Sequence, residues 1–385
     1  MNKLLSAQSD NPIIRWWWSI DRLNFILILS LAFIGVVMVA TASPSVATRI
    51  DLGGYHFLIR HVMFLFPALF IMVALAWVMP RNIWRVACIL YAVAFIGVIA
   101  TLVSGDEIKG AMRWIRLFGF SVQPSEFIKP AFIVLSAWFL SKQRLEIDFS
   151  GVIIALVLYA VTAGILIMQP DFGMFFLISI VFGMQIFLAG CPLRYVFVLG
   201  FIGIISICVA YMSLSHVQSR IDRFLFPEGA DTYQIDRSKE AFMNGGIIGT
   251  GPGQGTVKNQ VPDVHADFIF TAMGEEWGFI LTSLFVLMLG FIFFRFFTRF
   301  SRSESLFIML AGGGLTFMLA MQSFIHMGST LQLIPAKGMT LPFVSYGGSS
   351  LIAVGISFGI ILNLSRGIND DVKRSTWRHL TKKDF

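Results

Sequence analysis

Titratable side chains gather where a long polar segment meets the eighth apolar run of the chain. Asp267 lies at the start of that run, His265 precedes it by two residues, and Glu275 and Glu276 follow within the run. Aspartate is a favoured helix N-cap, but capping alone does not explain this accumulation. Asp267 is therefore the first candidate for a general base. His265 is a candidate for substrate contact, and a lone histidine does not predict a metal site.

Further polar motifs interrupt the apolar chain before this point. Arg113 stands beside Trp114, and its positive charge suits an anion. The run from Gln123 contains Glu126 and Lys129, which share a helix face because they are three residues apart. Two interpretations of that pair remain open: an ion pair that locks helix packing, or a charged site on the path of a substrate. Asp171 follows a proline and either caps the next helix or contacts substrate.

Two later segments combine glycine, hydroxyl groups and lysine. The run from Gly245 to Gly255 ends near Lys258 and matches neither the P-loop nor GxGxxG, so nucleotide binding is weakly indicated. Its glycines could instead bring backbone N–H groups to a phosphate or line a cavity. The segment 335–350 places Lys337 where it could neutralise an anionic headgroup. Its small residues, Ser345 and Ser349 among them, allow close helix approach or substrate contact.

Long apolar runs must position these residues. Hydrophobic residues make up 56% of the 385-residue chain, charged residues only 13%, and the mean hydropathy is +0.78. Such a chain needs lipid as part of its solvent. Runs of about 20 apolar residues predict an all-α membrane bundle of about ten transmembrane helices. The predicted spans are Leu23–Ala42, Val62–Val78, Trp84–Val103, Phe127–Leu140, Val152–Met168, Phe172–Ala189, Tyr195–Leu214, Phe268–Phe294, Leu306–Met327 and Leu341–Leu364.

The basic residues predict the orientation of this bundle. With the N-terminus in the cytoplasm, 17 of the 29 Lys and Arg residues fall in cytoplasmic segments and 11 in outer ones, and Lys129 lies within a span. The positive-inside rule therefore places both termini in the cytoplasm. It also explains the net charge of +7 without nucleic acid. The expected organisation is a cytoplasmic segment 1–22, a membrane domain 23–364 with a large outer loop 215–266, and a basic cytoplasmic tail 365–385.

Together these motifs resemble the SEDS (shape, elongation, division and sporulation) family of lipid-linked peptidoglycan polymerases, and the segment 336–343 resembles its division branch. The departure is His326, where the family usually has Asn. The matching blocks are Arg113-Trp114-Ile115, residues 123–129, residues 169–173, the glycine run with Lys258, residues 262–270 with Gly274-Glu275-Glu276, and residues 337–350.

The resemblance implies an inverting glycosyltransferase that polymerises lipid II during septal cell-wall synthesis at the bacterial inner membrane. It also implies a class B penicillin-binding protein and other division membrane proteins as partners. The family's essential carboxylate matches Asp267, the expected base. Because the leaving group is a diphosphate, one base and nearby positive charge suffice.

Arg113, Lys258 and Lys337 are the expected diphosphate contacts, and a divalent cation (Mg²⁺ or Mn²⁺) is a candidate cofactor. Two alternatives remain open: a lipid II flippase, and a division scaffold without chemistry.

Overall fold

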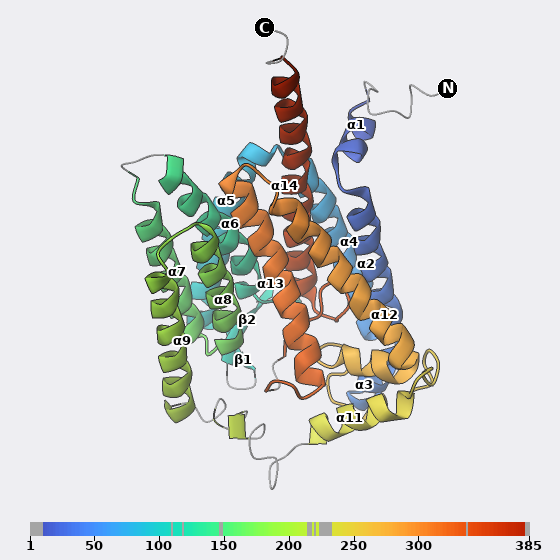
Figure 1. Cartoon of the computed structure of the whole chain (residues 1–385). Coiled ribbons are helices and arrows are strands. Elements are labelled where there is room, and N and C mark those ends of the chain that lie inside the picture. Colours follow the sequence, from blue (N-terminus) through green and yellow to red (C-terminus); the bar gives the residue numbers. More distant parts are fainter. Residues whose placement is uncertain are drawn as a thin grey trace, which may run out of the picture.

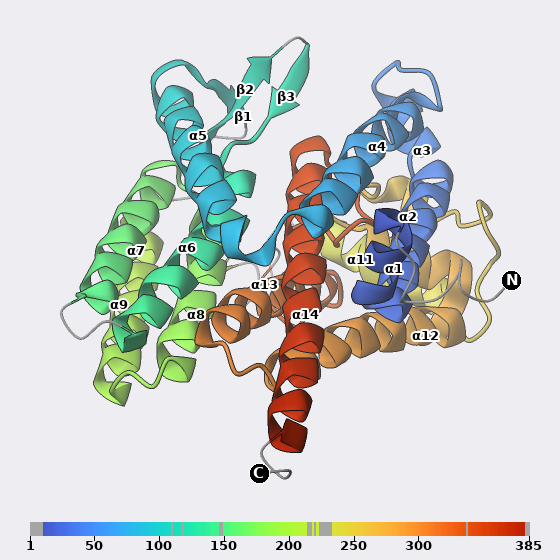
Figure 2. The same ribbon diagram turned by 90° about the horizontal axis from the view of Figure 1, so that it is seen from above.

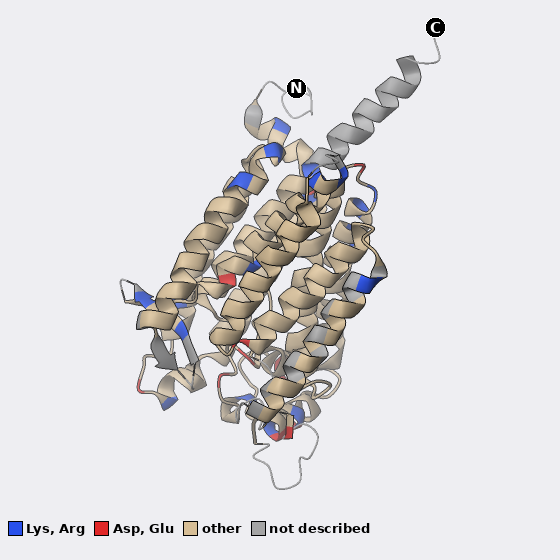
Figure 3. Ribbon diagram, turned by 90° about the vertical axis from the view of Figure 1, so that its left-hand side faces the viewer, with Lys and Arg blue, Asp and Glu red and all other residues tan. Residues whose placement is uncertain are grey.

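The computed structural model describes residues 11–108, 111–117, 119–145, 149–213, 218, 221–222, 233–335 and 338–381. These residues form a bundle of long helices, and the first and last described segments of the chain lie at the same end of it (Figure 1). Lys and Arg residues lie at the opposite end of the bundle and also near this one (Figure 3). There the buried Asp21 carboxylate accepts hydrogen bonds from Arg295 Nε at 2.9 Å and Arg299 Nη1 at 3.3 Å.

Each of the ten predicted spans overlaps a long helix. Within the part of the chain that the structure describes, seven helices are long and apolar enough to cross a membrane, and α8 is apolar but shorter. The count of ten spans stays a prediction. The helices are α2 (Arg22–Ala42), α4 (His56–Trp77), α5 (Ile83–Ser104), α6 (Ser125–Leu145), α7 (Gly151–Met168), α8 (Phe172–Leu188), α9 (Leu193–Ser213), α12 (Ile269–Phe300), α13 (Leu306–Thr330) and α14 (Gly348–Thr381).

Helices α13 and α14 occupy the centre of the bundle. Figure 2 shows α14 between α4 on one side and α6 on the other, and both helices contact it. The spanning part of α14 is 89% buried, whereas that of α4 is 22% buried. On α4, Phe66 and Phe70 are more than 70% exposed. Apolar side chains so exposed on a spanning helix face lipid rather than water.

Several ends of the predicted spans differ from the helix boundaries. The last long helix begins at Gly348 instead of Leu341, because residues 341–347 form a turn in which Phe343 has a φ of 60°. The fourth helix, Ser125–Leu145, differs mainly at its C-terminal end, which lies five residues beyond the predicted Leu140. Short helices α1 (Pro12–Ser19), α3 (Pro44–Arg49) and η1 (Pro80–Asn82) complete this part of the fold.

A small antiparallel sheet, unforeseen in the sequence, fills the connection between α5 and α6. Its order is β1 (Asp106–Ile108), β2 (Ala111–Leu117) and β3 (Phe120–Val122). Within it, Ile115 pairs with Val122. Because β2 carries Arg113, the sheet holds this arginine at the end of the bundle opposite the termini (Figure 1).

The predicted outer loop contains α11 (Tyr233–Gly245) and the short helix η2 (Lys258–Gln260). Helix α11 lies across the end of the bundle (Figure 1). Its buried Ser238 hydroxyl lies 2.6 Å from the Thr271 hydroxyl of α12 and donates to the Thr330 carbonyl at 2.9 Å. The loop is therefore fastened to two helices of the bundle.

Helix α12 is broken at Gly278, where φ is 67° and ψ is −174°. The glycine run bridges the break. Thr250 and Gly251 N–H groups donate to the Glu275 and Glu276 carbonyls, each at 3.0 Å. Across the break, the Phe279 and Ile280 N–H groups donate to the carbonyls of residues 246 and 247. These bonds replace those that a continuous helix would make. The expectation that the glycine run brings N–H groups to a phosphate is thereby corrected.

Candidate active site

A cavity of about 570 Å³, lined by many polar side chains, opens among α4, the sheet, α6, the start of α8, α13 and the segments that precede α12 and α14. Its wall combines residues from distant parts of the sequence. Eight of the eleven predicted site residues line it: Arg113, Gln123, Glu126, Lys129, Asp171, His265, Asp267 and Ser349.

Asp267 is half-buried in the cavity wall and does not cap α12. The N-cap residue of α12 is Phe268, and it makes no side-chain capping bond. A Cβ placed on Gly338 would lie 2.6 Å from Asp267 Oδ2, so the carboxylate sits directly against the backbone of residue 338. The capping interpretation of Asp267 is therefore wrong, and the carboxylate faces a space that a substrate can enter.

Arg113 is fixed by the turn that precedes α8. Its Nε donates to the Gln169 carbonyl at 3.2 Å, and a second nitrogen donates to the Pro170 carbonyl. Nη1 lies 3.6 Å from Asp171 Oδ1, and Asp171 also caps α8 through the Met174 N–H. The predicted cap is confirmed. The same carboxylate neutralises Arg113 at the cavity wall.

Glu126 and Lys129 form an ion pair in the cavity, with 2.8 Å between Oε2 and Nζ. Lys129 Nζ also donates to Gln322 Oε1 at 3.2 Å, and Gln322 Nε2 donates to the Thr340 carbonyl at 2.8 Å. This chain joins α6, α13 and the segment before α14. The packing interpretation of the pair is confirmed, and its place in the cavity leaves a substrate contact open as well.

Gln123 and Ser349 meet at the wall of the cavity. The Gln123 N–H donates to the Ser349 hydroxyl at 2.9 Å, which joins the start of α6 to the first turn of α14. Ser345, in contrast, is 1% exposed and does not line the cavity. Its hydroxyl accepts the Leu341 N–H at 2.9 Å and holds the 341–345 turn. The predicted substrate contact of Ser345 is therefore replaced by a structural role.

His265 lies between two aromatic rings. Its ring centroid is 4.2 Å from that of Phe57 and 5.1 Å from that of Tyr346, and its side chain is almost fully buried. Burial lowers the pKa of His265 to about 4, although nearby Asp263 opposes this shift. The imidazole is therefore neutral at physiological pH and lines the cavity as an aromatic group.

The lowered pKa of His265 predicts a pH effect on stability. Because the unfolded histidine titrates near 6.5 and the folded one near 4, protons favour the unfolded state as pH falls through that window. In the wild type, this histidine should lower the free energy of unfolding by roughly 3 kcal/mol at the acidic end. We expect the variant H265F not to show this decrease. Thermal unfolding in detergent from pH 7.5 to 4.5, compared between variant and wild type, measures it. Parallel pH profiles would contradict the prediction.

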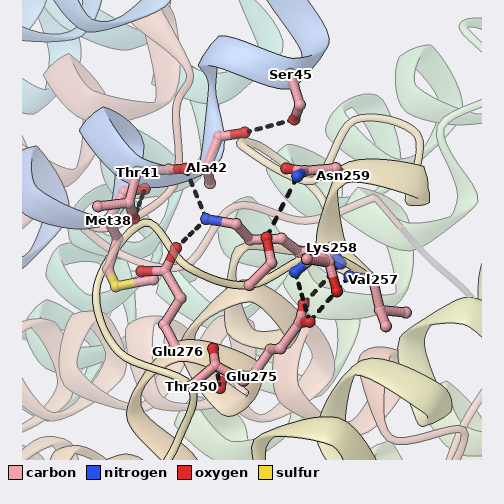
Figure 4. A network of polar contacts seen from close by, with 12 residues as sticks. Met38, Thr41, Ala42, Ser45, Thr250, Val257, Lys258, Asn259, Glu275 and Glu276 are labelled. Atoms are coloured by element: carbon pink, nitrogen blue, oxygen red, sulfur yellow. Dashed lines mark hydrogen bonds and ion pairs between the residues drawn. The ribbon is translucent and has the colours of Figure 1, made fainter.

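Lys258 lies outside the cavity, contrary to its expected contact with a diphosphate. Its side chain is 1% exposed, and its ammonium group pairs with Glu276 and donates to the Thr41 carbonyl at 2.7 Å (Figure 4). The Glu275 carboxylate accepts the backbone N–H groups of residues 256, 257 and 258 at 2.6–2.9 Å. These acidic residues therefore fasten the loop. Lys337 lies outside the described residues.

Several cavity residues had no individual role in the sequence analysis. Arg60, Gln322, Thr340 and Tyr346 all line the cavity. Each lies near the end of an apolar run, where a single polar residue resembles a boundary residue. The polarity of Arg60 at the start of a predicted span was the available signal. His326, the departure from the family pattern, lies outside the cavity wall and bonds the Met339 carbonyl through Nδ1 at 2.6 Å.

A divalent cation stays a prediction. Among the described residues, no group of three His, Cys, Asp or Glu side chains is arranged to hold a metal ion. We therefore derive no chemical step through a metal.

The fold and the cavity define a multi-pass membrane protein with a polar site at one end of its helix bundle. The family model FTSW_RODA_SPOVE, described as "Cell cycle protein", matches residues 21–369, and the chain belongs to this family.

Relatives cover nearly the whole chain. "Probable peptidoglycan glycosyltransferase FtsW" of Caulobacter vibrioides is 37% identical, with 91% of this chain and 90% of the relative covered. The protein of the same name from Coxiella burnetii is 34% identical, with coverage of 90% and 96%.

Solved structures show the same fold. One, described as "Structural coordination of polymerization and crosslinking by a peptidoglycan synthase complex", gives a TM-score of 0.75 at 26% identity and covers 91% of this chain and 98% of its own. The rod shape determining protein RodA of Thermus thermophilus gives 0.67 at 24% identity, with the same coverage, and its likeness concerns the fold alone.

Proposed function

We propose that the protein polymerises lipid II into glycan strands, with Asp267 as the general base. The observation that carries this proposal is the Asp267 carboxylate in a polar cavity at the end of the bundle opposite the termini. The relatives named as peptidoglycan glycosyltransferases support it, because the similarity covers 91% of this chain and the family match, residues 21–369, includes the cavity residues. A membrane bundle also suits a substrate on a polyprenyl chain.

The reaction joins two sugars and releases a diphosphate. Asp267 takes the proton from the 4-hydroxyl of the acceptor while the hydroxyl oxygen attacks the anomeric carbon of the donor. The bond from that carbon to the diphosphate oxygen breaks, its electron pair leaves with the diphosphate, and the anomeric configuration inverts. Since the diphosphate is a good leaving group, no second carboxylate has to protonate it. Positive charge in the cavity stabilises the departing anion.

The direct test is to incubate the purified chain with lipid II and look for glycan strands. We expect slow polymerisation by the chain alone and faster polymerisation with its class B penicillin-binding protein. The solved relative that concerns polymerization and crosslinking in one complex supports such a partner. Translocation of lipid II without strands would favour a flippase, and neither activity would favour a scaffold of the division septum.

The proposed orientation places the cavity on the outer face of the inner membrane and both termini in the cytoplasm. In a background without Cys88, Cys191 and Cys208, a cysteine at Gly229 should react with an impermeant thiol reagent added outside cells. A cysteine at Ser303 should react only after the membrane is opened. Labelling of intact cells followed by mass-tag electrophoresis measures this, and the reverse pattern would refute the orientation.

A further inference from the structure

The cations around the cavity differ in whether a carboxylate already neutralises them. Arg113 lies 3.6 Å from Asp171, and Lys129 lies 2.8 Å from Glu126. Lys258 is buried against Glu276, away from the cavity. None of these three side chains presents a positive charge without a carboxylate partner. A diphosphate that enters the cavity is attracted most strongly by a cation that no carboxylate already neutralises.

Arg60 is such a cation. It lies near the start of α4, lines the cavity and is half-buried. Among the described residues, no carboxylate oxygen lies within 4 Å of its guanidinium group, in contrast to Arg113 and Lys129. A guanidinium without a carboxylate partner at a half-buried wall is suited to an anionic ligand, and its planar fork matches phosphate oxygens.

Tyr346 connects Arg60 to the segment that carries the base. Its hydroxyl interacts with the positively charged Arg60 side chain, and both residues line the cavity. Its backbone N–H donates to the His265 carbonyl at 2.9 Å, and its ring packs on both His265 and Phe57. Arg60 thus lies beside a residue whose backbone is bonded to His265, two positions before Asp267. The base and this cation therefore share one wall of the cavity.

We propose that Arg60 binds the diphosphate of the lipid-linked donor and receives the negative charge that develops when the diphosphate leaves. This inference rests on the proposed function, since it names the residue that holds the leaving group. The electron pair of the broken carbon–oxygen bond goes to the diphosphate oxygen, beside Arg60. The proton of the acceptor goes to Asp267. The two residues thus serve opposite ends of the same displacement.

The test measures binding in a protein that does not turn over. The probe is undecaprenyl diphosphate, added to the purified D267N variant in detergent, with undecaprenyl monophosphate as a second arm. We expect R60Q to weaken diphosphate binding at least about tenfold, because a charge-assisted hydrogen bond is lost. R60K keeps the charge and should retain part of the affinity. R116Q, which removes an exposed arginine of β2 outside the cavity wall, is the matched control.

The outcomes separate this inference from the proposed function. Weaker diphosphate binding in R60Q, with normal binding in R116Q and a smaller loss for the monophosphate, supports it. Unchanged binding in R60Q overturns it, even if the wild-type chain polymerises lipid II. Equal losses in R60Q and R60K, together with a lower unfolding temperature, also overturn it, because packing would then explain the effect. If Arg60 is needed for diphosphate binding but the wild-type chain forms no strands, the role of Arg60 is supported and the proposed polymerase activity is refuted.

Discussion

Asp267→Asn should lower the rate of glycan polymerisation at least about a hundredfold, the low end for the loss of a general base. The amide keeps the size of the side chain but cannot accept the acceptor's proton. Because Asp267 does not cap α12, the change leaves the helix start intact. We therefore expect normal expression, normal thermal unfolding and unchanged binding of the lipid diphosphate.

The measurement is the initial rate of strand formation from lipid II by the purified protein with its transpeptidase partner. D263N is the matched control, since Asp263 lines the same cavity and its backbone carbonyl accepts the Asp267 N–H at 3.0 Å. If the rate of D267N is close to that of wild type and the rate of D263N is reduced, Asp263 rather than Asp267 is the general base.

The sequence predicted most of the helices and the main carboxylate for clear physical reasons. Long apolar runs can satisfy their backbone groups in lipid only as helices, so α2, α7 and α13 lie almost where they were expected. Asp267 was conspicuous because it stands at the edge of an apolar run, where a charged residue is a candidate functional residue.

Pairing between distant residues could not be predicted from the sequence. Lys258 and Arg113 look alike as basic residues in outer segments, yet one is buried against Glu276 and the other lines the cavity. The difference depends on the break at Gly278 and on the loop that bridges it, and these involve contacts between segments far apart in the chain. Arg60 was missed for the same reason, because the absence of a carboxylate near it is a property of the fold.

The Lys258–Glu276 pair fastens the loop that leads to Asp267, so breaking it should have the largest effect on stability. Both side chains are almost fully buried, and the ammonium group also bonds the Thr41 carbonyl of α2. K258M leaves the Glu276 carboxylate buried without its partner, which costs roughly 3–5 kcal/mol.

The double variant K258M/E276M removes both charges. It should recover most of that loss, because two apolar side chains of similar volume replace a buried ion pair. Lys239 is exposed on α11, so K239M should unfold like wild type. Chemical unfolding in detergent gives the free energies, and strand formation measures how well the loop still positions Asp267. If K258M matched K239M in stability, the pair would not hold the loop. If the double variant stayed as unstable as K258M, the loss would come from the Thr41 contact rather than from an unpaired charge.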